Sequence, residues 1–232
     1  MQKWNGKMKA VTFSFDDGTI QDVRLVELLN KYGLKATFNL NSGYLGVRGQ
    51  EPWRGYVGFD HVSASMVKTL YDGHEVAVHT LTHCALTQQN EETIIRQIEE
   101  DRKALESLCG YDIIGMAYPW GAGQEPVLGI VRAYTPIQYA RTAAQTLDFS
   151  VQRENLLMWN PTIYWISERL EEVVNHFLEI QSNELQLLSI WGHSYELDEN
   201  LETIDWVKIE KIFQKISGQA DIFYGTNREV LL

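Results

Sequence analysis

The feature that most constrains the fold is a regular alternation of strand-like and helix-like patterns along the chain. Short runs of β-branched and aromatic residues are separated by stretches in which apolar residues recur with helical spacing. We predict strands at residues 9–15, 36–40, 75–78, 113–117, 138–140, 185–191 and 221–224. We predict helices at residues 20–31, 63–71, 90–108, 127–133, 167–180 and 205–216. This alternation implies an α/β fold with a parallel sheet and right-handed crossovers.

The number of strand–helix units predicts how the sheet is arranged. About seven parallel strands within 232 residues favour a (β/α) barrel over an open sheet. Because no repeat, linker or low-complexity segment interrupts the pattern, we predict a single domain at residues 1–232. The Gly-rich residues 41–60, which include Trp53 and Tyr56, are expected to form a long loop that is either functional or mobile.

Composition excludes several classes of partner. A formal net charge of −11 argues against nucleic acid or an anionic membrane surface as the main partner.

The N-terminus has no apolar leader, and no apolar run reaches transmembrane length, so we expect a cytoplasmic protein. A chain that had lost its leader would have the same sequence. Cys84 and Cys109 make no disulfide framework, and oligomeric state is not readable from the sequence.

Polar residues follow the first predicted strand. Asp16 and Asp17 come where this strand stops, and Gly18 permits a sharp exit. Two adjacent carboxylates repel one another unless a cation lies between them or one holds a proton. The alternative is a solvated Asp-Asp-Gly turn. In a barrel, chemistry is located at the C-terminal ends of the strands, which favours the functional interpretation.

Two histidines follow the third predicted strand. His79 and His83 are four residues apart, which lets both imidazoles bind one metal ion. Asp17 offers a third ligand of the carboxylate type. Two histidines and one carboxylate leave a coordination position open for water, as in catalytic metal sites. The alternative is a pair of surface or capping histidines.

Two further strand ends carry candidate residues. Pro119 and Gly121 flank Trp120 in a rigid turn whose backbone N–H groups can point into the barrel mouth; the alternative is a simple tight turn. His193 follows the strand at residues 185–191 and is close in sequence to the carboxylate of Glu196. A histidine in this position is a candidate general acid, although a structural role is the alternative.

At this point the sequence resembles a known family, the polysaccharide deacetylases with the NodB homology domain, carbohydrate esterase family 4. Residues 12–18, T-F-S-F-D-D-G, resemble the T-F-D-D-G motif of that family, and residues 79–83 match its H-[ST]-x-x-H motif. Residues 35–38, K-A-T-F, resemble the strand between these motifs, and residues 224–229, Y-G-T-N-R-E, resemble a common closing segment. The resemblance covers essentially the whole chain, in order.

The resemblance implies a distorted (β/α) barrel, one divalent metal ion, usually zinc, and an acetylated carbohydrate substrate. It implies that the metal ligands are Asp17, His79 and His83. It also implies that Asp16 is the general base, that His193 is the general acid in an L-x-x-H motif where Ile190 replaces Leu, and that the Trp120 N–H is an oxyanion donor.

The sequence departs from the family pattern in two places. The R-x-P-[YF]-G motif reads A-Y-P-W-G at residues 117–121, so Ala117 replaces the arginine that holds the base. Arg141, after the next strand, could supply a guanidinium; a surface salt bridge is the alternative. The family's fourth motif, which contains an Asp and a Trp, has no clear match in this sequence. The nearest candidates are Asp148 and Trp159.

These residues predict hydrolysis of an N-acetyl group from an amino-sugar glycan or glycoside by metal-activated water. The alternatives are an O-acetyl esterase, a small-amide hydrolase using the same site, or a carbohydrate-binding pseudoenzyme, which the missing arginine permits. The sequence does not define the sugar, its chain length or the metal identity.

Overall fold

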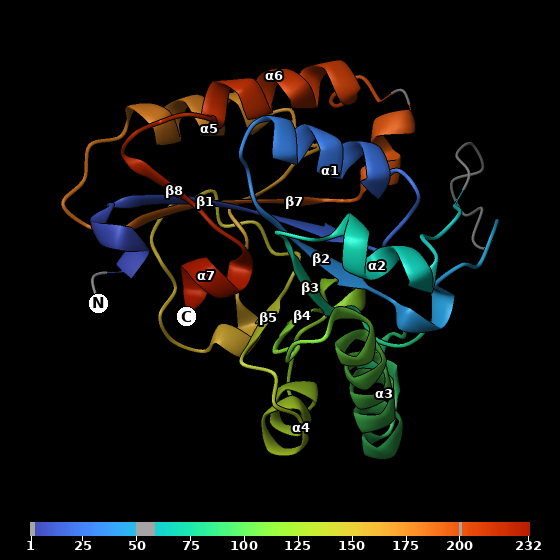
Figure 1. Cartoon of the computed structure of the whole chain (residues 1–232). Coiled ribbons are helices and arrows are strands. Elements are labelled where there is room, and N and C mark those ends of the chain that lie inside the picture. Colours follow the sequence, from blue (N-terminus) through green and yellow to red (C-terminus); the bar gives the residue numbers. More distant parts are fainter. Residues whose placement is uncertain (1–2, 50–58, 200) are drawn as a thin grey trace.

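The computed structural model describes residues 3–49, 59–199 and 201–232, which form a curled parallel sheet surrounded by helices (Figure 1). Seven strands run in the order β5-β4-β3-β2-β1-β7-β6, and β8 pairs with β1. The strands are β1 (Lys9–Asp16), β2 (Ala36–Leu40), β3 (Glu75–Val78), β4 (Gly115–Ala117), β5 (Tyr139–Arg141), β6 (Ile163–Tyr164), β7 (Gln186–Gly192) and β8 (Ile222–Tyr224). The predicted distorted (β/α) barrel is confirmed.

Seven α-helices in the described residues connect the strands or follow the last one. They are α1 (Asp22–Lys31), α2 (Ala64–Leu70), α3 (Glu91–Cys109), α4 (Val127–Tyr134), α5 (Leu170–Glu179), α6 (Trp206–Ile216) and α7 (Asn227–Leu231). Short 3-10 helices occur at Lys3–Gly6, Ser42–Tyr44, Leu86–Gln88, Pro119–Gly121, Leu156–Met158 and Ser194–Asp198. Among the described residues, no helix combines the length and apolarity needed to cross a bilayer.

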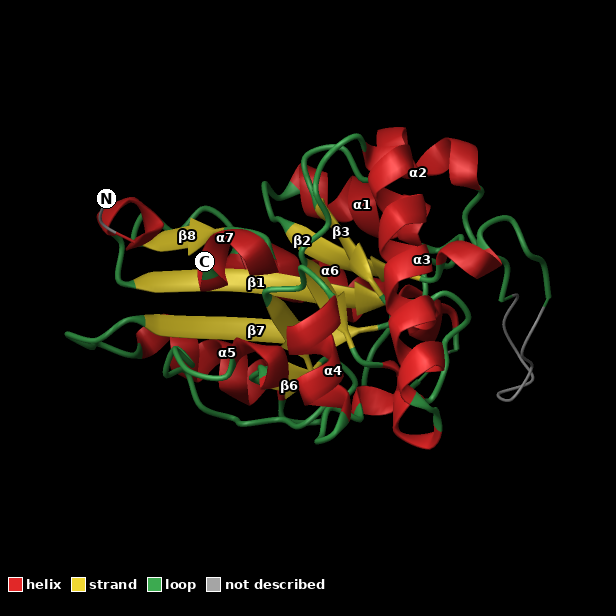
Figure 2. Ribbon diagram, turned by 90° about the horizontal axis from the view of Figure 1, so that it is seen from below, coloured by secondary structure: helices red, strands yellow, loops and turns green. Residues whose placement is uncertain are grey.

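Strand β1 lies at the centre of the sheet and carries the first part of the site. It pairs with β7 along most of its length, with β8 beside its first residues and with β2 beside its last ones (Figure 2). Its side chains alternate between two environments, as the pleat requires. Phe13 and Phe15 face the helices, whereas Ser14 and Asp16 face the barrel interior.

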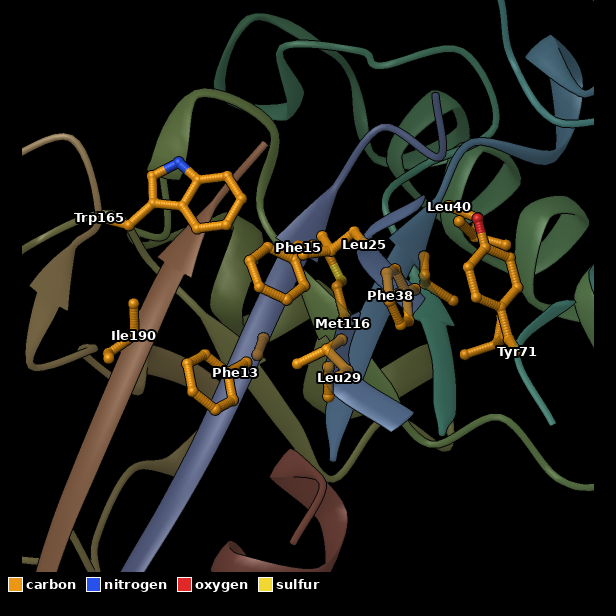
Figure 3. Close-up of a cluster of buried hydrophobic side chains, with 14 of the residues drawn as sticks. Phe13, Phe15, Leu25, Leu29, Phe38, Leu40, Tyr71, Met116, Trp165 and Ile190 are labelled. Atoms are coloured by element: carbon orange, nitrogen blue, oxygen red, sulfur yellow. The ribbon is translucent and has the colours of Figure 1, made fainter. Parts of the chain in front are cut away.

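The apolar core lies between the outer face of the sheet and the helices, and Figure 3 shows part of it. Phe15 packs against Phe38 from β2 and Trp165, with ring centroids 5.7 and 4.8 Å away. Leu25 and Leu29 of α1 are fully buried in the same cluster. Burial of each such side chain contributes about 1.5–3 kcal/mol to the stability of the fold. This apolar layer therefore fixes the strands whose ends form the site.

The structure adds two elements that the pattern did not predict. Strand β6 has only two residues, Ile163 and Tyr164, and lies next to β7, while Trp159 just before it forms a parallel bridge to Arg141 of β5. The segment therefore joins the two edges of the curled sheet. Helix α7 follows β8 and lies on the side of β1 opposite α1, α5 and α6 (Figure 1). Of the predicted loop at residues 41–60, residues 50–58, with Trp53 and Tyr56, lie outside the described part of the chain.

Candidate active site

Two carboxylates occupy the C-terminal end of β1. Asp16 is its last residue, and Asp17 begins the turn with a φ of 78°, held there by a backbone bond from its N–H to the Asn39 carbonyl at 3.0 Å. Gly18 also has a positive φ, and an added Cβ would lie 2.7 Å from the Leu40 side chain. The glycine is therefore required both by the turn and by the close approach of β2.

His79 and His83 face the Asp17 carboxylate from the end of β3. Each Nε2 lies 3.6 Å from Asp17 Oδ1. The turn that brings both rings to one side places Thr80 and His83 at positive φ values of 65° and 50°. The His79 Nδ1 lies 2.9 Å from the Ala117 carbonyl oxygen, to which it donates, so its Nε2 keeps a lone pair facing Asp17.

The ligating atoms of Asp17, His79 and His83 all lie within 4.8 Å of one another, which is close enough for one ion to contact all three. Burial lowers the pKa of both His79 and His83 to about 4, so the rings are neutral near pH 7 and able to bind a metal. Burial also raises the pKa of Asp17, and the charge of Asp16 adds to this effect. A cation between these groups would favour the ionised form of Asp17 and so lower the pKa of its carboxyl again. The residues therefore fit a divalent metal ion.

Arg141, the last residue of β5, lies across the barrel mouth against Asp16. Its Nη2 is 2.5 Å from both carboxylate oxygens of Asp16, while its Nε and Nη1 donate to Ser14 Oγ at 3.0 Å and the Thr142 carbonyl at 2.9 Å. The guanidinium is 1% exposed. A single guanidinium nitrogen therefore contacts both oxygens of the Asp16 carboxylate.

The charge state of Asp16 follows from this pairing. Burial would raise the pKa of this carboxyl, but the Arg141 guanidinium, with His79 and His193, outweighs burial and lowers the pKa to about 2. Asn39 adds a further bond, from Nδ2 to Asp16 Oδ1 at 2.8 Å. Asp16 is therefore an oriented carboxylate near neutral pH.

His193 follows β7 and is held by a buried carboxylate. Its Nδ1 lies 3.2 Å from Glu196 Oε1, and its Nε2 lies 4.0 Å from Asp17 Oδ2. Glu196 is fully buried and also accepts bonds from the Trp165 indole at 2.7 Å and from Tyr164 Oη. Burial would lower the pKa of His193, but the Glu196 charge outweighs it, aided by Asp17 and Asp16, and raises the pKa to about 9. The ring is therefore protonated near pH 7.

These groups line one pocket of about 170 Å³ at the barrel mouth. Trp120 forms one side of it with a φ of 62°, a rare conformation for a bulky residue. Its side chain is 56% exposed, and its ring lies edge-on to His83 with centroids 5.0 Å apart. Trp191 also lines the pocket, and its ring centroid lies 4.7 Å from Arg141 Cζ.

The pocket brings together seven of the site residues that the sequence analysis named: Asp16, Asp17, His79, His83, Trp120, Arg141 and His193. It does not include the two weaker candidates. Asp148 is exposed and accepts bonds from Ser150, and Trp159 packs against Tyr139. Sequence reasoning did not assign a role to Trp165, Trp191 or Asn39. The spacing of His193 and Glu196 was the one available signal for the carboxylate beside the histidine.

A curled (β/α) barrel with carboxylates and histidines at its strand ends defines the class of protein: one with the fold of carbohydrate esterase family 4. The chain belongs to the polysaccharide deacetylase family, whose model matches residues 3–136.

Curated relatives agree with this assignment. A peptidoglycan-N-acetylglucosamine deacetylase from Listeria monocytogenes is 29% identical over 122 residues, which cover 51% of this chain and 23% of the relative. The match therefore spans about a quarter of that protein.

Two solved structures show the same fold. A family 4 carbohydrate esterase from Streptomyces lividans superposes with a TM-score of 0.56 at 16% identity, covering 95% of this chain and 92% of that one. A family 4 pseudoenzyme from Bacillus anthracis gives a TM-score of 0.57 at 19% identity, covering 98% and 66%. At these identities the similarity establishes the fold alone, and the chemistry must be argued from the residues of the site.

Proposed function

We propose that this protein is a metal-dependent deacetylase that removes an N-acetyl group from an amino-sugar glycan or glycoside. The observation that carries the proposal is the convergence, on one small pocket, of an Asp-His-His ligand set, an Arg-held carboxylate and a Glu-held histidine. A binding protein would need no such acid–base pair. The name of the Listeria relative, a deacetylase of N-acetylglucosamine in peptidoglycan, supports an acetylated glycan as the substrate class.

Asp17, His79 and His83 would hold the metal, with zinc as the expected ion because two imidazoles and one carboxylate suit it. When bound there, a divalent ion lowers the pKa of water from ~15.7 towards ~7 and polarises the acetyl carbonyl.

Asp16 serves as the general base in this proposal. The Arg141 guanidinium keeps its carboxylate ionised and aimed into the pocket, and Asp16 takes the proton of the attacking water. The Trp120 N–H is proposed to donate to the oxyanion, an interaction worth about 3 kcal/mol in comparable acyl-transfer sites.

His193 serves as the general acid. An amine is expelled slowly unless it receives a proton, and His193 carries one near neutral pH because Glu196 stabilises the charged ring. This protonated acid favours an amide over an ester substrate, because an ester's alkoxide leaving group depends less on it.

The test is acetate release from a panel of N-acetylated and O-acetylated glycans, glycosides and small amides by the zinc-loaded protein. We expect release from N-acetylated amino sugars, and loss of about 10²–10⁴-fold in turnover for Asp16→Asn and for His193→Ala with metal content retained. Release from O-acetyl substrates alone would favour the esterase, and glycan binding without release would favour the pseudoenzyme. Either result contradicts the proposal.

A further inference from the structure

The N-terminal end of helix α7 enters the barrel interior beside β1. Thr226 caps the helix, its side chain accepting the Glu229 N–H while the Glu229 carboxylate accepts the Thr226 N–H. The next residue, Asn227, is fully buried. Its backbone N–H donates to Thr37 Oγ1 and its Oδ1 accepts from Thr12 Oγ1, both at 2.9 Å. Figure 2 shows the helix against β1 and β8.

The Asn227 amide is also the far end of a hydrogen-bond chain that reaches the proposed base. Asn227 Nδ2 donates to Ser14 Oγ at 3.2 Å, Ser14 Oγ accepts from Arg141 Nε at 3.0 Å, and Arg141 Nη2 holds Asp16. Ser14 and Asn227 are 0% exposed and Arg141 is 1% exposed, so water does not compete within the chain. Bonds in such a water-excluded interior are strong, and an unmade bond there is costly.

The position of the guanidinium depends on where each nitrogen is held. Nη1 is bound to the neighbouring Thr142 carbonyl and Nη2 to the carboxylate, and Nε makes the third contact that fixes the plane. Ser14 Oγ accepts from Nε with one lone pair, and the Nδ2 groups of Asn227 and Asn39, 3.2 and 2.9 Å away, share the other. A misplacement of about 1 Å at a reacting group can cost about 10²-fold in rate.

We propose that Asn227 is a positioning residue: through Ser14 it orients the Arg141 guanidinium, and thereby Asp16, so the C-terminal helix takes part in forming the active site. The inference rests on the proposed function for its kinetic consequence, but the orientation of Arg141 is testable without turnover.

The first experiment follows hydrogen exchange of the Arg141 Nε–H by NMR, with the signal assigned by its absence in Arg141→Lys. Asn227→Ala should accelerate this exchange at least 10-fold. The matched control is Val230→Ala, which removes a buried contact of the same helix with the cluster around Trp4 and touches neither Ser14 nor Arg141. Val230→Ala should lower the Tm while leaving the Arg141 Nε–H exchange unchanged. Equal acceleration in both variants, or none in Asn227→Ala, would overturn the inference.

The second experiment is a double-mutant cycle on turnover. Asn227→Ala should lower kcat about 10-fold with KM and zinc content unchanged, whereas in the Arg141→Lys background it should lower kcat less than about 2-fold, since lysine has no Nε–H to orient. Additive losses would overturn the inference. A wild-type protein that releases no acetate from any substrate would refute the proposed function instead, and the exchange experiment would still decide the role of Asn227.

Discussion

Glu196 sets the protonation state of His193, and this gives a pH prediction. With the pKa of His193 raised to about 9, the wild-type kcat should fall as the pH rises through about 9, because the acid loses its proton. Glu196→Gln removes the largest of the charges that raise this pKa; Asp17 and Asp16 remain, as does burial, which lowers it. The alkaline limb of the kcat profile should therefore move to lower pH. Glu202→Gln, an exposed carboxylate near the same loop, is the control and should not move it.

Arg141 is the second residue whose chemistry makes a sharp prediction. Arg141→Lys keeps a positive charge but lacks the planar fork whose three nitrogens bind Ser14, Thr142 and Asp16, so kcat should fall. Arg141→Ala should lower it further, because Asp16 then loses the charge that favours its ionised form. Zinc content, measured by elemental analysis, should stay at the wild-type value in both. An Arg141→Ala variant with wild-type kcat would remove Arg141 from the mechanism.

At the scale of single residues, the sequence predicted that these side chains share a pocket, because each lies at the end of a strand and parallel strands end at one rim. It could not predict which nitrogen of Arg141 meets which oxygen of Asp16. That pattern depends on Ser14, which reads in sequence as an ordinary strand residue. No sequence pattern marked Trp165 as part of the site either. Gly192 leaves room for its indole, since an added Cβ would lie 2.2 Å from Nε1, and no local pattern reports a contact of that kind.

At the scale of elements, α3 holds the histidine-bearing loop. The fully buried Asp101 accepts the His79 N–H at 3.1 Å and the Ser42 N–H at 2.7 Å. Gln97 accepts the Thr82 N–H at 3.0 Å. Asp101→Ala would leave two backbone donors without their carboxylate and loosen the loop, so zinc affinity should fall about 10–100-fold. Titration against a competing chelator measures it.

Asn90→Ala provides the matched control on the same helix. Asn90 caps α3 by accepting the Thr93 N–H at 2.9 Å, far along the chain from Asp101. Its loss should cost about 1 kcal/mol of unfolding free energy and leave zinc affinity unchanged. Equal zinc affinities in Asp101→Ala and wild type would show that α3 does not position the loop.

Elements with strong local signals were predictable, and those formed by tertiary contacts were not. Helix α3 has a cap, a helical apolar spacing and a C-terminal Gly110, and the predicted residues 90–108 match it closely. Strand β6 is two residues long and exists because β7 lies beside it, so a period of two could not be recognised. Helix α7 had a signal, the Thr226–Glu229 capping box, which was assigned only as a closing segment.

Across the whole molecule, apolar side chains fill the space between sheet and helices, while the barrel interior carries buried polar groups. Thr12, Ser14, Thr37 and Glu75 line that interior, and α7 satisfies several of them. The strands are therefore buried on both faces, which explains why their sequences read as near-continuous strand signals. The polar interior extends up to the mouth, where Ser14 contacts Arg141, the partner of the proposed base Asp16.

The metal should stabilise the whole fold, because its proposed ligands come from the turns after β1 and β3. A ligand that binds only the folded state adds about 2.7 kcal/mol at a free concentration 100-fold above its Kd. At about 2–4 °C per kcal/mol for a chain of this size, zinc should raise the Tm by roughly 5–10 °C. A chelator should reverse the rise. The triple variant Asp17→Ala, His79→Ala, His83→Ala should show no zinc-dependent shift, since it lacks all three proposed ligand side chains. The same zinc-dependent shift in the triple variant would mean that the ion binds elsewhere.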